Sequence, residues 1–290
     1  MYCRKHRMLY SFAVLAVYLL CCSGCAGSTT TALKNYFNSL DHFTPYKNDA
    51  RVLYEPGAEA FAAAVAERLP SAVHKVETRQ YSEFPEHIEI YVFKSHDSFK
   101  KIIGRDVRGV CYRKRVFLSP EFLEEEDQLG AYLAHELSHL HLVQYLGEFG
   151  RFGIPMWFTE GLATYVSDGG GAQHVTHAEV KESIQSGNHF LPSEKAGITE
   201  LMRPKNAGYY GIEHPNKHHL FYGQCMLFVA FLEKKNPVQF ENFLNRLKDG
   251  AKFSRTFQSS FYTDTISIWE EFKEKIGNTD CPVYQTTGSG

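Results

Sequence analysis

The sequence lacks the long apolar run and the charge excess that mark membrane-spanning and nucleic-acid-binding proteins. No hydrophobic stretch reaches the roughly 18 consecutive apolar residues of a confident transmembrane helix. The formal net charge is only −2 over 290 residues, so the basic domain expected of a nucleic-acid binder is absent and we expect no nucleic-acid partner. Hydrophobic residues make up 43% of the chain, which excludes intrinsic disorder and predicts a globular protein with a sizeable core.

Cysteine is too scarce, at seven residues, for a disulfide-dense scaffold. Four cysteines lie beyond the N-terminal segment: Cys25, Cys111, Cys225 and Cys281. None of the last three has a CxxC spacing, which argues against a cysteine-based zinc site. If Cys25 carries a lipid, these three can form at most one disulfide, and the sequence leaves their redox state open.

The N-terminus has the pattern of an export signal. A basic start at Arg4–Arg7 precedes the apolar run Leu9–Leu20, and small residues follow. Ser23-Gly24-Cys25 resembles the lipobox of bacterial lipoproteins, although Cys22 stands where that family usually has Leu. The resemblance implies a signal peptide at 1–24, a lipid on Cys25, and an exported protein anchored to a membrane of the cell envelope. An ordinary cleaved signal or an uncleaved anchor is the alternative.

The remaining chain predicts a tether at 25–50, an α+β domain at 51–278 and a tail at 279–290. Alternating β-branched residues predict a strand at His87–Phe93, and Val110–Leu118 predicts a hairpin. A helix is expected from Gly57 to Leu69, ended by Pro70, and another from Ser95 to Ile103. We therefore expect a small N-terminal mixed sheet with helices, followed by a mostly helical C-terminal part. Its predicted helices are Leu129–Leu146, Trp157–Val166, Leu220–Glu233, Gln239–Leu247 and Thr265–Ile276.

The residues that indicate chemistry are His135-Glu136-Leu137-Ser138-His139, an H-E-x-x-H pattern inside a predicted helix. Two histidines four residues apart lie on one helix face, so both rings can bind one metal ion. Glu136 is the residue type that takes a proton from a zinc-bound water. His141 should point away from that face and is not expected to be a ligand.

A catalytic zinc takes three protein ligands and keeps one position open. The third candidate is Glu160, which lies in the predicted helix that follows. Three glycines between the two helices allow the chain to reverse and return this carboxylate to the histidines. The metzincin alternative needs a third histidine shortly after the pair, and none occurs between His141 and His174.

H-E-x-x-H followed by W-x-x-E-G-x-A resembles the gluzincin zinc peptidases, the superfamily of thermolysin and the alanyl aminopeptidases. The arrangement is most similar to bacterial peptidase-MA-like domains, over roughly Ile88 to Ile276. This resemblance implies one Zn²⁺ per chain, held by His135, His139 and Glu160, with Glu136 as general base. It also implies a peptide or protein substrate.

Two further roles remain open among alternatives. For stabilising the oxyanion, Tyr222 is the first choice by its position in the resemblance, and the competitors are His214, His218 and His219. Thr164 is the candidate partner for a zinc-bound histidine, with Asp168 behind it. An exposed polar loop is the interpretation of the pair His174 and His177, without a metal role. A flexible turn is the interpretation of Asp168–Gly171, without a nucleotide role.

The substrate is only broadly constrained. Aminopeptidases of this group hold the free amine with acids from a segment before the zinc helix, and the matching segment Gly109–Arg113 has none. This favours an endo-acting peptidase whose substrate adds to a strand edge, with Val116–Leu118 as the expected edge. The alternative function is a catalytically silent binding or assembly lipoprotein that keeps the zinc fold. The presence of Glu136 favours the enzyme, because a binding module needs only the metal ligands.

Overall fold

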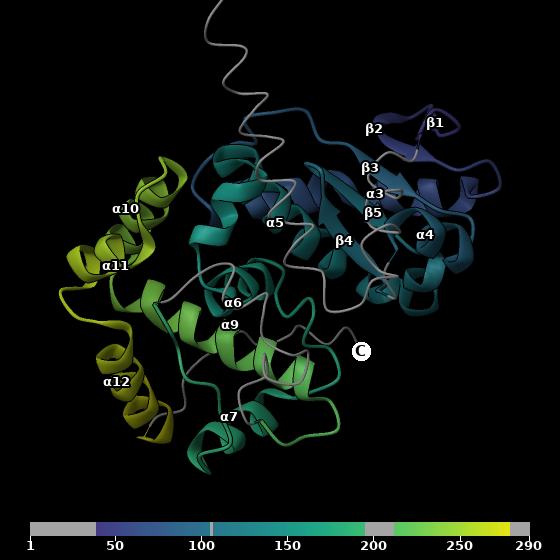
Figure 1. The fold of residues 1–290 in the computed structure, drawn as a ribbon. Coiled ribbons are helices and arrows are strands. Elements are labelled where there is room, and N and C mark those ends of the chain that lie inside the picture. Colours follow the sequence, from purple (N-terminus) through teal and green to yellow (C-terminus); the bar gives the residue numbers. More distant parts are fainter. Residues whose placement is uncertain (1–38, 105–106, 195–211, 279–290) are drawn as a thin grey trace, which may run out of the picture.

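A five-stranded mixed sheet forms the N-terminal part of the protein (Figure 1). The computed structural model describes residues 39–104, 107–194 and 212–278, so the predicted signal peptide, Cys25, Cys281 and the tail lie outside the described residues. The sheet order is β1-β2-β3-β5-β4, with parallel pairs β2·β3 and β3·β5 and antiparallel pairs β1·β2 and β4·β5. The strands are β1 Thr44–Tyr46, β2 Asp49–Tyr54, β3 Ile90–Val92, β4 Gly109–Tyr112 and β5 Arg115–Leu118.

Two sequence expectations about this sheet are wrong. The tether predicted at 25–50 overlaps the folded domain, because β1 and the start of β2 pair with each other within it. The expected edge Val116–Leu118 is an internal strand, since β5 pairs with β3 on one side and β4 on the other. The strand at that end of the described sheet is β4. Sequence patterns place strands but carry little information about their order, which long-range packing decides.

Helix α3, Glu59–Arg79, continues through the proline expected to end it. Pro70 removes one helical hydrogen bond, at a cost of about 3 kcal/mol in a helix interior. The buried side chains Phe61, Val65, Leu69, Ala72 and Val76 lie on both sides of that position and form one continuous stripe. Packing of this stripe against the core holds the two halves in one helix.

The next elements follow their sequence signals. Helix α4, His96–Ile103, begins where the Ser95 hydroxyl accepts the Ser98 backbone N–H at 3.1 Å and ends at Gly104, whose φ of 74° is left-handed. Arg113 and Lys114 form the tip of the β4–β5 hairpin with φ values of 54° and 55°. The predicted helix and hairpin are therefore confirmed, and only their ends shift by a residue.

The C-terminal part is helical, as predicted, with two helices that the sequence reading missed. One is α7, His177–Gln185, read as a polar loop although Thr176 and Glu179 form a capping box at its start. The other is α11, Phe253–Phe261, whose buried phenylalanines pack on α10. The remaining helical segments are η1 Pro120–Gln128, α5 Leu129–Gly150, η2 Arg151–Gly153, α6 Met156–Val166, α9 Lys217–Lys235, α10 Pro237–Lys248 and α12 Thr265–Asn278.

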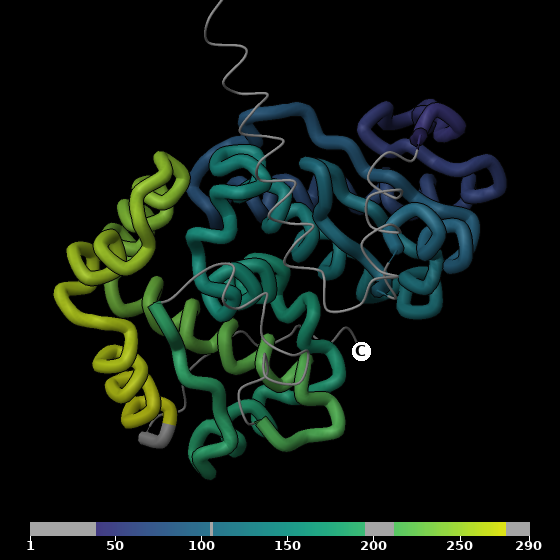
Figure 2. Tube along the Cα trace, viewed as in Figure 1, coloured from purple at the N-terminus to yellow at the C-terminus, as the bar shows by residue number. Residues whose placement is uncertain are grey.

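Helix α5 joins the two parts of the molecule. It packs on α3 and on strands β4 and β5, and on its other side it meets α6, which in turn lies along α9 (Figures 1 and 2). An aromatic core fills the helical part, centred on Trp157, Phe158, Phe228 and Trp269. No helix in the described part of the chain is long and apolar enough to cross a bilayer. This arrangement places α5 and α6 side by side.

Candidate metal centre

Two histidine rings project from one face of α5. The Nε2 atoms of His135 and His139 are 3.2 Å apart, one helical turn separating the residues. The leucines around them are fully buried and seat the helix in the core. His141 points the other way, as predicted, and its Nδ1 lies 2.7 Å from Oε1 of Gln80. Helical periodicity thus leaves two imidazole nitrogens facing α6.

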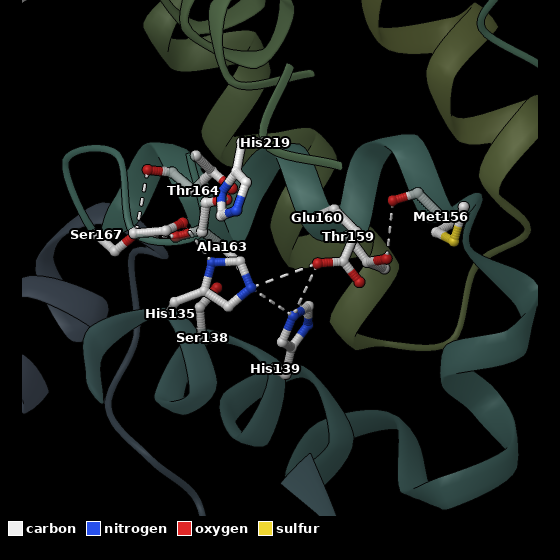
Figure 3. A network of polar contacts seen from close by, with 12 residues as sticks. His135, Ser138, His139, Met156, Thr159, Glu160, Ala163, Thr164, Ser167 and His219 are labelled. Carbon is white, nitrogen blue, oxygen red and sulfur yellow. Dashed lines mark hydrogen bonds and ion pairs between the residues drawn. The ribbon is translucent and has the colours of Figure 1, made fainter. Parts of the chain in front are cut away.

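Glu160 completes the group from α6 (Figure 3). Its Oε2 lies 3.4 Å from His135 Nε2 and 3.3 Å from His139 Nε2. The chain reverses between the two helices, beginning at Gly147, whose φ of 75° interrupts α5, and α6 starts after Pro155. Among the described residues, these three form the one cluster of histidine, cysteine or acidic side chains close enough to hold a metal ion.

The spacing of the three atoms fits a tetrahedral metal site. Ligand atoms about 2.0–2.1 Å from a tetrahedral zinc lie about 3.3–3.4 Å from one another. The observed separations of 3.2, 3.3 and 3.4 Å match that triangle. Two imidazoles and one carboxylate are also a ligand set used by catalytic zinc, with a fourth position left open. The residues present therefore fit the ion.

A backbone carbonyl orients the first ligand. His135 Nδ1 lies 2.7 Å from the carbonyl oxygen of Gly170, so Nδ1 donates its proton there and Nε2 is left to bind metal. A Cβ on Gly170 would meet Ser167 Oγ at 2.5 Å and the Ala131 carbonyl oxygen at 2.6 Å. Only glycine fits this position, and the Asp168–Gly171 run, interpreted as a flexible turn, is a closely packed part of the site.

The side chains expected to perform this orienting role do not do so. The Thr164 hydroxyl is buried and has no hydrogen-bond partner among the residues that the structure describes. Asp168 instead pairs with Lys75 at 2.8 Å and Arg79 at 2.5 Å on α3. Arg79 also donates to the carbonyl oxygen of Tyr165, so the two residues fix the end of α6. No sequence signal could have identified Gly170, because every residue has a carbonyl.

The three candidate ligands open onto a cavity of about 350 Å³ between α5, α6 and strand β4. Glu136 lines this cavity and is half-buried. Burial raises the pKa of the Glu136 carboxyl, and the adjacent His135 and His139 lower it by less, so the net pKa is above its ordinary value. A carboxylate with a raised pKa is a better proton acceptor, as a general base requires. The remaining cavity wall is mostly apolar, and includes Val110, Leu142, Val143, Phe152, Ile154 and Met156.

Glu160 has the opposite electrostatic environment. Its burial raises the pKa, but the charges and hydrogen bonds of His139 and His135 lower it by more, so the net shift is well below the ordinary value. The carboxylate is consequently ionised near neutral pH. The two acids of the site are thus separated into one suited to accept a proton and one suited to bind a cation.

Tyr222 lines the cavity, whereas the competing histidines do not. Its ring stacks on that of His135, with centroids 5.8 Å apart and planes inclined by 25°. His219 Nδ1 lies 2.7 Å from the Gly171 carbonyl oxygen and so supports the glycine loop. His214 Nδ1 accepts the backbone N–H of Asn216, and His218 is exposed.

The cavity also contains two residues for which the sequence predicted no part in the site. Arg151 from η2 and Cys111 from β4 both line it. Cys111 and Cys225 are both buried. His174, interpreted as an exposed loop histidine, is exposed as expected and lies against the His219 ring at 4.5 Å.

Comparison with known proteins yields little beyond a distant likeness of fold. No family model matches the chain, and no curated protein matches it. Among solved structures, it is similar to yeast LTA4 hydrolase in complex with bestatin, at 15% sequence identity and a TM-score of 0.45. The match covers 79% of this chain and 36% of that protein, so the chain spans about a third of its length. Family and activity are not assigned by this likeness, and the His135, His139 and Glu160 cluster fits the H-E-x-x-H…E pattern on its own geometry.

Proposed function

We propose that this protein is a zinc-dependent peptidase of the gluzincin type. One Zn²⁺ would be held by His135, His139 and Glu160, and Glu136 would act as general base. The observation that carries the proposal is the ligand triangle, whose sides of 3.2–3.4 Å fit zinc and which opens onto a cavity lined by Glu136.

Zinc, when bound, supplies a water of lowered pKa and polarises the substrate carbonyl. Glu136 takes the proton as the water attacks and passes it to the leaving amine. The Gly170 carbonyl keeps the His135 ring in the tautomer whose Nε2 faces the cavity. Tyr222, whose ring stacks on that of His135 in the cavity wall, is the candidate donor to the developing oxyanion.

The cavity wall formed by β4 suggests how a peptide would bind. Gly109, Val110 and Cys111 of this strand line the cavity, and β4 is the last strand of the described sheet. An extended peptide can pair with such an edge through main-chain hydrogen bonds. None of these three residues is acidic, so nothing on this strand would hold a free amino terminus. We therefore propose an endopeptidase rather than an aminopeptidase.

The protein is further proposed to be exported and tethered to a membrane of the cell envelope by lipid on Cys25. The support is the sequence pattern of 1–25 alone. Mass spectrometry of the N-terminal peptide from the membrane fraction tests it, and an unmodified Cys25 would exclude the lipid anchor.

Zinc content and hydrolysis test the main proposal. We expect one zinc per chain by elemental analysis, much less in His135→Ala and Glu160→Ala, and no change in the control His218→Ala, which alters an exposed histidine. Glu136→Gln should keep the zinc and lose hydrolysis of a peptide library. If Glu136→Gln hydrolyses peptides at the normal rate, the assigned mechanism is wrong. If the wild type binds zinc but cleaves no peptide, the protein is a silent binding module instead.

A further inference from the structure

Arg151 places a permanent positive charge in the wall of the candidate active site. It begins η2, directly after α5, and is half-buried. Among the described residues that line the cavity, it is the only lysine or arginine. The other ionisable groups there are the ligand set, Glu136, the Cys111 thiol and the Tyr222 phenol.

The guanidinium has no acceptor within the part of the chain that the structure describes. Its recorded contact is with the Phe152 ring, 5.3 Å from Cζ to the centroid. Glu148, one turn earlier, accepts the Lys114 backbone N–H at 2.6 Å instead of pairing with Arg151. By contrast, Arg108 pairs with Glu125 at 3.0 Å, and Arg115 pairs with Glu89. Five N–H donors in a fixed planar fork are thus left beside an open cavity, which is costly unless a ligand or water meets them.

The charges of Arg151 and of the proposed general base Glu136 lie near the same stretch of β4. Burial raises the pKa of the Cys111 thiol, the Arg151 charge lowers it, and the Glu136 charge raises it. Both charges therefore lie near this strand, along which a peptide would bind. In a peptide bound along β4, a group that contacts Arg151 would therefore lie within a few residues of the peptide bond that faces Glu136.

The charge balance of the cavity favours an anion. A bound Zn²⁺ would be neutralised by Glu160 and Glu136 together. Arg151 then leaves the cavity with a net charge of about +1, which favours negatively charged ligands. Planar guanidinium groups bind carboxylates through two parallel hydrogen bonds.

We propose that Arg151 is a specificity-determining residue that binds a carboxylate of the substrate, carried by the residues next to the cleaved bond. The proposal rests on the peptidase function and narrows its substrates to anionic peptides. The carboxylate can be the C-terminus of the peptide or the side chain of Asp or Glu. Lysine would keep the charge but lose the paired geometry.

A binding experiment separates this proposal from catalysis. The full chain carrying Glu136→Gln, purified in detergent and loaded with zinc, is titrated into N-terminally fluorescein-labelled peptide libraries, and polarisation reports binding. The libraries are identical except in two respects. The C-terminus is either a free acid or an amide, and one position carries either Glu or Gln. The same titrations use Arg151→Met, Arg151→Lys and Arg255→Met in that background. Arg255 is exposed on α11 and does not line the cavity, so its variant controls for the change in net charge.

We expect carboxylate libraries to bind about 10- to 100-fold more tightly than their amide counterparts, the range for hydrogen bonds to a charged group. The preference should vanish in Arg151→Met, fall in Arg151→Lys and persist in Arg255→Met. Loss confined to the free-acid arm identifies a C-terminal carboxylate, and loss confined to the Glu arm identifies a side chain. The proposal is overturned if the preference for carboxylate libraries survives in Arg151→Met. It is also overturned if the Glu136→Gln parent protein shows no such preference, or if none of the carboxylate libraries binds.

The outcome does not depend on turnover. Arg151-dependent binding together with zinc-bound protein that never hydrolyses peptides would overturn the proposed function and leave Arg151 as a recognition residue. Hydrolysis without any Arg151-dependent preference would overturn only the role of Arg151. In active protein, Arg151→Met should raise KM for anionic peptides with little change in kcat.

Discussion

The close approach of α6 to α9 gives a sharp test of how the site is held. Gly161 lies on α6 next to Glu160, and a Cβ there would lie 2.7 Å from the Cys225 carbonyl oxygen and 2.9 Å from Val229 Cγ2 on α9. The first of these neighbours is backbone and cannot rotate away. Gly161→Ala therefore requires the two helices to separate by a sizeable fraction of an ångström.

The expected loss of stability follows from two opposing contributions. Overpacking of a well-filled core costs about 3 kcal/mol at the upper end of its usual range, which applies when a backbone atom blocks the new methyl group. Alanine in a helix interior is favoured over glycine by about 1 kcal/mol. The net destabilisation of Gly161→Ala should be about 2 kcal/mol. For a chain of this size that corresponds to a melting temperature lower by about 4–8 °C.

Gly130→Ala is the matched control, because it introduces the same methyl group near the start of α5. A Cβ at Gly130 would meet nothing within 4 Å. Only the helix-propensity gain remains, so this variant should be unchanged or more stable by up to about 1 kcal/mol. Thermal unfolding followed by circular dichroism measures both variants. The two substitutions are thus expected to have opposite signs.

The same substitution should weaken metal binding. Displacement of α6 moves the Glu160 carboxylate relative to His135 and His139, whose present separations from it are 3.4 and 3.3 Å. Competition with a chromophoric chelator, at a temperature where Gly161→Ala is fully folded, should show lower zinc affinity than in Gly130→Ala. If Gly161→Ala is as stable as Gly130→Ala and binds zinc equally well, the argument that helix packing positions the third ligand is refuted.

Three further predictions concern the surroundings of the site. Gly170→Ala should weaken zinc binding without unfolding the protein, because its Cβ would displace the carbonyl that accepts the His135 Nδ1 hydrogen bond. The ¹⁵N chemical shifts of the His135 ring should then show loss of the Nδ1–H tautomer. An unaltered tautomer would contradict the role of the loop. Burial lowers the pKa of Lys248 to about 8, so on raising the pH the folded state releases this proton before the unfolded state does. The free energy of unfolding of wild type relative to Lys248→Met should therefore rise by roughly 2–3 kcal/mol from pH 7 to pH 10. Denaturant titrations measure it, and a difference that does not change with pH would show that the amine has an ordinary pKa. Cys111 and Cys225 are buried, and burial raises the pKa of the Cys111 thiol. Both cysteines should therefore resist a thiol-specific reagent at pH 8 until the protein is denatured. Rapid labelling of either cysteine in the native protein, located by mass spectrometry, would contradict their burial.

The sequence by itself determined the features that depend on short-range order. The H-E-x-x-H spacing placed His135 and His139 on one helix face and turned His141 away, because helical periodicity alone fixes these directions. Ser95 and Gly104 marked the ends of α4 through local cap geometry. These features need no knowledge of distant parts of the chain.

Tertiary structure decided what brings distant groups together. Side-chain packing joins these remote segments. The buried stripe on α3 keeps the helix continuous through Pro70, and the contact of α6 with α5 brings Glu160 to the histidines. The order of the strands, which makes β4 rather than β5 the outer strand, likewise depends on long-range pairing. The role of the Gly170 carbonyl could not be predicted, because a backbone carbonyl has no sequence signature. Nor could it be predicted that the Arg151 guanidinium has no acceptor among the described residues, because this is known only when its neighbours are placed.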